Sequence, residues 1–176
     1  NIRINNKYLK MDIHTKRNLE LTESIRNKER MYSLLWLLDE TKTAMGGRLL
    51  KSWIESPLLD IDKINHRYDT VSTLLNEFIL SEELRKYLYD VYDLERLCGR
   101  IALGSANAKD LIQLKESLKI LPEINEILKK INYTTLPDIS ELYNLLESSL
   151  YENPPQTLKE GYLIKEGYNK ELDELK

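Results

Sequence analysis

Apolar residues recur at three- and four-residue spacing along most of the chain, which is the pattern of amphipathic helices. After Asp60 one such stripe continues for about five turns and predicts a long helix. Its members are Ile61, Ile64, Tyr68, Val71, Leu75 and Phe78. Only six Gly and five Pro occur in 176 residues, which favours helices over many short strands and turns. We therefore expect about eight helices joined by short links.

The stretch from Thr41 to Asp60 predicts the helix around which the chain packs. The Thr43 hydroxyl can cap its start, and Pro57 ends it because the residue before a proline is pushed out of the helical region. The apolar stripe of this helix is broad and includes Met45, Leu49 and Trp53. We expect Trp53 to be a core residue and the helix to be a central packing element.

Gly46 and Gly47 are unusual in the first turns of this helix, since each glycine costs about 1 kcal/mol relative to Ala. Such a cost is accepted where another backbone comes close, so we expect close packing here. Together with Arg48 and Lys51-Ser52, the glycine pair has a superficial likeness to a nucleotide-binding loop, but no glycine directly precedes Lys51. Anion binding at the helix start is the less favoured alternative.

Several further helix starts are expected from residues that cap or favour a first turn. They are Ser81 ahead of two glutamates, Asp93, Asn107 with Asp110, Pro122, and Asp138 with Glu141. Nearer the end, 161–164 predicts a short strand that Gly167 terminates, and Tyr168, Leu172 and Leu175 begin a new amphipathic helix. The expected fold is an all-α, multi-helix orthogonal or bundle core domain with a short strand near the C-terminal end.

Composition narrows the function classes. Apolar residues make up 41% of the chain, which supports a core, and the net charge of −3 does not favour a freestanding nucleic-acid binder. One cysteine, Cys98, excludes an internal disulfide framework. We see no secretory segment and no apolar run of about 18 residues, so the expected location is the cytoplasm. Asn1 and the helical pattern still present at Leu175 suggest a segment of a longer polypeptide.

Candidate chemistry is sparse. His14 and His66 have no second histidine at helical spacing, so an ordinary surface role is favoured for both over metal binding. Basic residues between 109 and 130, including Lys115, alternate with glutamates and are interpreted as a solvated face rather than a phosphate stripe. A tyrosine cluster at 87, 89 and 92 suits a partly wet packing surface. These residues alone predict a non-catalytic helical module.

Six sequence blocks resemble the core domain of the bacterial MutS family of DNA mismatch-repair ATPases, in the same order and with compatible spacing. They are NLELTESIR (18–26), LLWLLDETKTAMGGRLLKSWIESPLLD (34–60), DLERLCGRIALGSANAKDL (93–111), LKESLKILPEI (114–124), NPP (153–155) and EGYLIKEGYNKELDEL (160–175). The resemblance covers residues 8–176. A related core is shared by a paralogue that acts in recombination, but the detailed match favours the mismatch-repair branch.

The resemblance implies a core, or lever, domain between an ATPase domain and a DNA-gripping clamp. Residues 1–167 would form the first part of this domain, and 168–176 would begin the long helix that leads toward the clamp. The only phenylalanine, Phe78, is followed by Ile79 and not by the family's Phe-x-Glu mismatch reader. The ATPase signature is also absent from the sequence. We therefore expect no catalysis and no cofactor in this segment, with ATP and Mg²⁺ bound by the family's ATPase domain.

The family's motif blocks map onto packing and coupling positions in this chain. These are Asn18, Glu20, Thr41, Met45, Gly46, Gly47, Arg48, Trp53, Glu95, Arg96, Gly167, Tyr168, Asn169 and Glu171. The implied partners of the full-length protein are other domains of the same chain, mismatched double-stranded DNA held by the mismatch-reading and clamp domains, a second copy in a homodimer, and a MutL-type repair protein, with no membrane. The alternative is a freestanding helical module that binds protein or single-stranded nucleic acid through its tyrosine-rich face.

Overall fold

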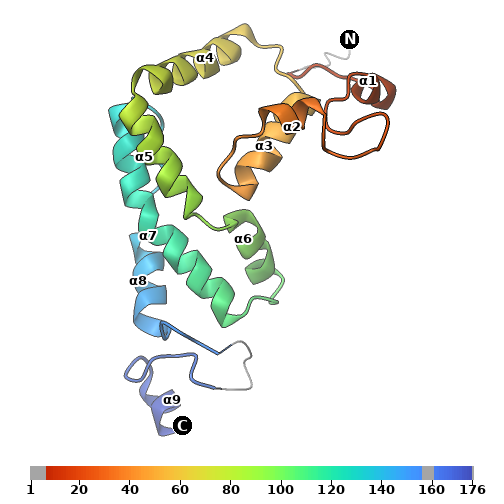
Figure 1. Cartoon of the computed structure of the whole chain (residues 1–176). Coiled ribbons are helices and arrows are strands. Elements are labelled where there is room, and N and C mark those ends of the chain that lie inside the picture. Colours follow the sequence, from red (N-terminus) through yellow and green to blue (C-terminus); the bar gives the residue numbers. More distant parts are fainter. Residues whose placement is uncertain (1–6, 156–160, 176) are drawn as a thin grey trace, which may run out of the picture. The chain divides into compact units, whose positions relative to one another are not determined.

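The computed structural model describes residues 7–155 and 161–175, and Figure 1 shows their helices. The first of two compact units ends at Glu83, inside α5. Its helices are α1 (Ile13–Asn18), α2 (Leu34–Leu38), α3 (Ala44–Glu55), α4 (Ile61–Asn76) and the start of α5 (Phe78–Tyr89). The second unit holds the rest of α5, α6 (Leu94–Ala102), α7 (Ala108–Lys130), α8 (Ser140–Ser149) and α9 (Lys170–Glu174). The all-α prediction is confirmed.

Several helix starts follow from local sequence. The side chains of Ser33, Thr43 and Asp93 accept hydrogen bonds from backbone N–H groups in the first turns of α2, α3 and α6. Asn107 and Asp110 form a full capping box at the start of α7, with both reciprocal bonds between 2.8 and 2.9 Å. The predicted caps at Thr43, Asp93 and Asn107 are confirmed, because a cap depends only on residues three positions apart.

The core of the second unit lies where α7 packs against α6 and α8, as Figure 1 shows. Its buried members are Leu97, Leu114, Leu118, Leu146 and Leu150. Ser117, fully buried on α7, accepts a 3.0 Å hydrogen bond from the backbone N–H of Tyr92 and so fixes the α5–α6 link. The apolar stripe expected on this part of the chain therefore does face a core.

Lys115 corrects the interpretation of the basic residues on α7 as a solvated face. Its side chain is 5% exposed, and its Nζ lies 2.8 Å from a Glu147 carboxylate oxygen on α8. Burial opposes protonation of Lys115, but the Glu147 hydrogen bond and the charges of Glu147 and Glu116 outweigh it, so the pKa of Lys115 is raised. A buried lysine on an amphipathic helix resembles a surface lysine in sequence, because its partner lies 32 positions away.

The sequence predicts that Pro122 begins a helix, but Pro122 lies inside the 23-residue α7. Proline is disfavoured in a helix interior because it lacks the N–H that would bond to the preceding turn. The core contacts of Leu114 and Leu118 on one side and burial of Ile124 and Ile127 on the other outweigh this local preference. Two predicted helices are therefore one.

Two further predicted helix starts are wrong. Ser81 lies within α5, which begins at Phe78, and the Ser81 N–H donates to the Glu77 carbonyl. Asp138 accepts from the backbone N–H of Ser140 at 2.9 Å, while Ile139 occupies the cap position of α8 without a side-chain bond. In both cases a polar residue next to a turn has more than one local hydrogen-bonding option.

The predicted strand at 161–164 is reduced to a single antiparallel bridge between Leu150 and Ile164, and no strand forms in the described residues. A similar bridge joins Tyr8 to Leu58. One bridge is too little pairing to make a sheet. The new helix expected after Tyr168 is present as α9, capped by Asn169.

The first unit departs most from the predicted packing. Trp53 is 39% exposed, and α3 has no buried residue, so the expectation of Trp53 as a core side chain is wrong. The guanidinium of Arg67 on α4 instead lies over its indole, with Arg67 Cζ 3.4 Å from the ring centroid. Most of the long stripe on α4 is also exposed, although Ile64 is half-buried. Periodicity identified these faces correctly as apolar, but it carries no information on what covers them.

Candidate functional site

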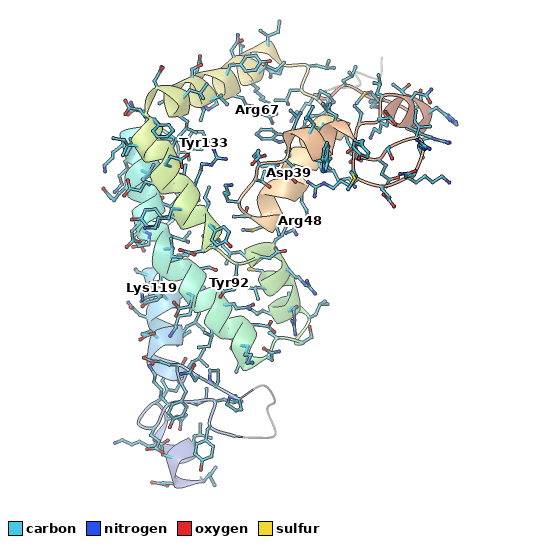
Figure 2. The ribbon with its side chains drawn as sticks, viewed as in Figure 1. Asp39, Arg48, Arg67, Tyr92, Lys119 and Tyr133 are labelled. Atoms are coloured by element: carbon cyan, nitrogen blue, oxygen red, sulfur yellow. The ribbon has the colours of Figure 1, made fainter. Side chains whose placement is uncertain are left out.

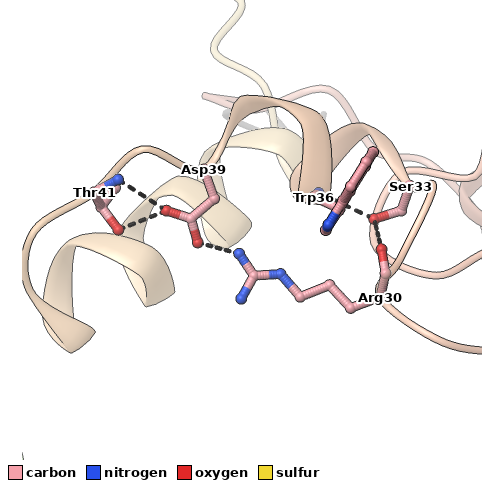
Figure 3. Close-up of polar contacts among 5 residues, drawn as sticks. All are labelled: Arg30, Ser33, Trp36, Asp39 and Thr41. Carbon is pink, nitrogen blue, oxygen red and sulfur yellow. Dashed lines mark hydrogen bonds and ion pairs between the residues drawn. The ribbon is translucent and has the colours of Figure 1, made fainter.

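The link between α2 and α3 brings together several residues that the sequence predicts for coupling. We call residues 39–43 the Asp39 turn. Asp39 Oδ1 accepts from the Thr41 hydroxyl at 2.6 Å and from the Thr41 backbone N–H at 3.1 Å, while its Oδ2 pairs with Arg30 (Figure 3). Three donors on one carboxylate, one of them charged, hold the turn in a single arrangement.

Arg30 and Ser33 attach the same turn to the preceding loop. The Ser33 hydroxyl donates to the Arg30 carbonyl at 2.7 Å and accepts from the Trp36 N–H at 3.2 Å, as Figure 3 shows. Ser33 is 2% exposed, so these bonds are made away from water. One short network therefore connects the loop before α2, the start of α2 and the Asp39 turn.

The glycine pair allows this turn to fold against α3. A Cβ at Gly46 would lie 3.0 Å from Thr43 Oγ1 and 3.3 Å from Thr41 Cβ, and one at Gly47 would lie 3.4 Å from both Asp39 Oδ2 and Thr41 Oγ1. A close approach is present, but it is not the approach of another backbone that the sequence predicts. It involves side chains of the adjoining turn, which explains why two helix-weakening residues occur in succession.

The hydrogen bond from the Thr41 hydroxyl holds the pKa of Asp39 below its ordinary value. Partial burial acts in the opposite direction, and the Thr41 backbone N–H and the Arg30 guanidinium add to the lowering. The ionised carboxylate is thus the form that the folded turn favours.

A hollow of about 710 Å³ lies beside the Asp39 turn. Its charged lining is mostly basic and includes Lys28, Arg48 and Lys51. The acidic side chains in the lining are Glu23 and Asp39. Figure 2 labels Asp39 and Arg48 in this part of the first unit. The Gly46 N–H already donates to Thr43 Oγ1 at 2.9 Å and the Gly47 N–H to the Thr43 carbonyl at 3.1 Å. These two amides of the helix start are therefore engaged by the protein itself.

Glu20 and Asn18 belong to the same unit. Asn18 ends α1. Glu20 has a positive φ of 48°, its carboxylate accepts from the Ile25 N–H at 2.7 Å, and its carbonyl accepts from the Leu34 N–H at 2.9 Å. Glu20 thus stabilises the loop that precedes α2, and Thr22 and Glu23 of that loop line the hollow beside the Asp39 turn.

The other predicted coupling residues are not part of this site. Glu95 and Arg96 lie exposed on α6, and the Arg96 N–H donates to the cap residue Asp93. At the start of α9, the Gly167 N–H donates to Asp173 at 2.7 Å and Asn169 accepts from Leu172 at 3.1 Å. Tyr168 is 45% exposed and Glu171 is in the first turn of α9. Both groups lie in the second unit.

Sequence reasoning missed the roles of Asp39 and Arg30. Asp39-x-Thr41 is a spacing at which an aspartate accepts from the residue two positions on, so the turn itself was predictable. The Arg30 contact was not, because it joins residues nine apart across a loop of irregular backbone.

Fold and site together define the class of this protein. It is an all-helical domain in which polar contacts stabilise the starts of helices and the loops between them. In the described ranges, no group of three or more His, Cys, Asp or Glu side chains is arranged to hold a metal ion. None of the helices in the described part of the chain is long and apolar enough to cross a membrane.

Comparison with known proteins identifies the family. Residues 14–176 match the family model described as MutS domain III. The chain is 56% identical over 173 residues to the DNA mismatch repair protein MutS of Bacillus pumilus (strain SAFR-032), and 53% identical over 173 residues to that of Bacillus subtilis (strain 168). Each match covers 94% of this chain and 20% of the relative. The chain belongs to the MutS domain III family, and it spans about a fifth of the length of these relatives.

Proposed function

We propose that this chain is the core, or lever, element of a DNA mismatch-recognition ATPase, and that it couples the ATPase domain to the DNA-binding clamp. Family membership supports the repair role, since the relatives are named DNA mismatch repair proteins. Mismatched double-stranded DNA, ATP with Mg²⁺, a homodimeric partner and a MutL-type protein would be bound by the full-length protein in the bacterial cytoplasm. No catalytic role falls to a residue of this chain.

The observation that carries the coupling role is the close contact between the Asp39 turn and the glycine pair. A lever requires that a displacement of one helix be passed to the next, and close-packed contacts transmit strain because they have little room to deform. Asp39, Thr41 and Thr43 of the Asp39 turn take part in four polar contacts. A Cβ at Gly46 or Gly47 would lie within 3.0–3.4 Å of side-chain atoms of this turn. Two ligands become coupled when both bias the same element between two arrangements.

Substitution of Gly47 by Leu in the full-length protein tests this role, with Gly99→Leu as the control. A side chain at Gly47 meets Asp39 and Thr41, whereas a Cβ at Gly99, on the exposed face of α6, has no neighbouring atom within 4 Å. We expect Gly47→Leu to weaken the effect of ATP on affinity for mismatched DNA by about 0.5–2 kcal/mol. Basal ATPase should fall less, and Gly99→Leu should change neither.

Equal losses of basal ATPase and of the effect of ATP on DNA affinity in Gly47→Leu would mean general unfolding and would contradict the coupling role. Family membership favours this role over the freestanding binding module.

A further inference from the structure

The hollow beside the Asp39 turn gathers basic side chains from separate segments of the first unit. One face of α3 supplies Gly47, Arg48 and Lys51, because positions three and four apart lie on the same side of a helix. Lys42 comes from the Asp39 turn and Lys28 from the loop before α2, and together they line about 710 Å³ of space. The chain as a whole carries a net charge of −3, so the basic hollow departs from the overall balance.

The two arginines of the lining are already engaged. Arg30 pairs with Asp39, which offsets both charges, and Arg48 interacts with another residue. These side chains form part of the wall but are not counted toward the charge offered to a ligand.

The three lysines of the lining are not engaged in this way. In the part of the chain that the structure describes, Lys28, Lys42 and Lys51 are exposed and form no ion pair. The acidic side chain that remains in the lining is Glu23. Three lysines against one glutamate leave a charge of about +2 for a ligand to neutralise.

Hydroxyl donors line the same space. Thr43 Oγ1 accepts from the Gly46 N–H at 2.9 Å, which leaves its own proton available to donate. Thr22, in the loop before α2, adds a second hydroxyl. The Gly46 and Gly47 amides are engaged within the protein, so side chains and not the start of α3 would hold an anion.

We infer that this hollow binds a dianionic phosphate group, either free phosphate or the phosphate of a monoester. A phosphate monoester carries about −1.5 to −2 charges at pH 7 and presents three acceptor oxygens. This ligand matches the net charge and the ammonium and hydroxyl donors, since lysine binds phosphate as a point charge. A carboxylate would leave one positive charge uncompensated. A DNA backbone has one charge per phosphate and would need cations in a row rather than around one hollow.

Lysine acetylation in the full-length protein tests this site and does not depend on the coupling role. Acetic anhydride reacts with the neutral amine, and a bound phosphate favours the charged form, so occupancy slows the reaction. Inorganic phosphate replaces chloride at constant ionic strength, and peptide mass spectrometry measures each lysine. We expect Lys28, Lys42 and Lys51 to react several-fold more slowly in phosphate. Lys63, which is 57% exposed on α4 and outside the lining, should be unchanged.

The same measurement distinguishes the two sources of the phosphate group. Protection by both inorganic phosphate and adenosine 5′-monophosphate indicates a monoester site, whereas protection by inorganic phosphate alone indicates free phosphate, and both results support the inference. Equal protection of Lys63, protection by duplex DNA but not by phosphate, or no protection would each overturn it. Low reactivity of the three lysines before phosphate is added would mean that other side chains fill the hollow, and would also overturn it.

A variant pair separates direct binding from an effect relayed from elsewhere in the protein. Lys51→Gln should raise the phosphate concentration that half-protects Lys42 by about tenfold, because one charge-assisted contact is lost. Lys63→Gln is the control and should leave this midpoint unchanged. Lys51 and Lys63 are both exposed, so neither substitution disturbs a core. An unchanged midpoint in Lys51→Gln would show that Lys42 is protected by another cause and would overturn the inference.

Discussion

At Gly46 a hydrogen atom occupies a place where a methyl group would not fit without movement. The neighbour at 3.0 Å is Thr43 Oγ1, which is held by its own bond to the Gly46 N–H, so it cannot easily yield. A Cβ contact this short is avoided in proteins, and extra atoms in a packed site typically cost about 1–3 kcal/mol. The cap that starts α3 and the glycine that follows it therefore depend on each other.

Gly46→Ala should accordingly destabilise α3 by up to about 2 kcal/mol, because the overlap exceeds the gain of about 1 kcal/mol that alanine brings to a helix. Gly99→Ala on α6 has no atom to meet and should stabilise that helix by up to about 1 kcal/mol. Amide hydrogen exchange in the full-length protein measures both locally. Equal stabilisation by the two substitutions would refute the close packing at Gly46.

The carboxylate of Asp39 gives the turn a pH dependence. Its pKa is lowered from 3.8 in the folded chain, so its contribution to stability is fully present above about pH 4 and is lost as pH falls through the lower folded value. In the full-length protein, protection of the Thr41 amide should decrease more steeply below pH 4 than intrinsic exchange explains. Asp39→Asn should begin with lower protection and lose this dependence.

Thr41→Val keeps the Asp39 carboxylate but removes the hydroxyl that lowers its pKa most. This control should show a weaker pH dependence than the unsubstituted protein and a stronger one than Asp39→Asn. An identical pH profile in all three proteins would mean that Asp39 does not hold the turn.

At the scale of helices, the Lys115–Glu147 pair joins α7 to α8. Lys165 adds to it, since its Nζ donates to the Glu147 carbonyl at 2.5 Å. Glu147 is 44% exposed, whereas Lys115 is 5% exposed, so the two residues are not equivalent. Removing the carboxylate leaves an ammonium group with little access to water, whereas removing the lysine leaves a carboxylate that water can reach.

We therefore expect Glu147→Gln to destabilise the α7–α8 contact, because the buried Lys115 ammonium loses its 2.8 Å partner and keeps only Glu116 at 3.7 Å. Lys115→Met should cost less, because it removes the buried charge and keeps the apolar stem. Hydrogen exchange of the α8 amides in the full-length protein reports both. A larger loss in Lys115→Met than in Glu147→Gln would contradict this order.

How far the sequence predicts each helix depends on the range of the contacts that determine it. The caps at Thr43, Asp93 and Asn107 were predictable because each needs one side chain and an N–H group a few residues away. Pro122 was misread because long-range burial on both sides of it keeps α7 continuous. Trp53 was misplaced for a related reason: its face is apolar, but the covering group, Arg67, lies on another helix.

At the scale of the whole chain, the two units differ in how much of their apolar surface they bury. The second has a core between α6, α7 and α8. The first has a network of polar contacts at the Asp39 turn, and most apolar side chains on one face of α4 are exposed. The glycine pair and Thr41 were predictable as a close-packed start of α3. That Asp39 and Arg30 complete the site was not, because a loop without periodicity brings them together.

The central claim is that the Asp39 turn belongs to an element that both ATP and mismatched DNA bias. Hydrogen exchange of the Thr41, Gly46 and Gly47 amides in the full-length protein tests it most directly, in the free, ATP-bound and mismatched-DNA-bound states. The Leu136 amide, held by Asn125 at 2.7 Å, is an internal reference in the second unit. The account predicts that each ligand changes exchange at the turn several-fold more than at Leu136. Exchange at the turn that stays unchanged in both the ATP-bound and the mismatched-DNA-bound state would contradict it.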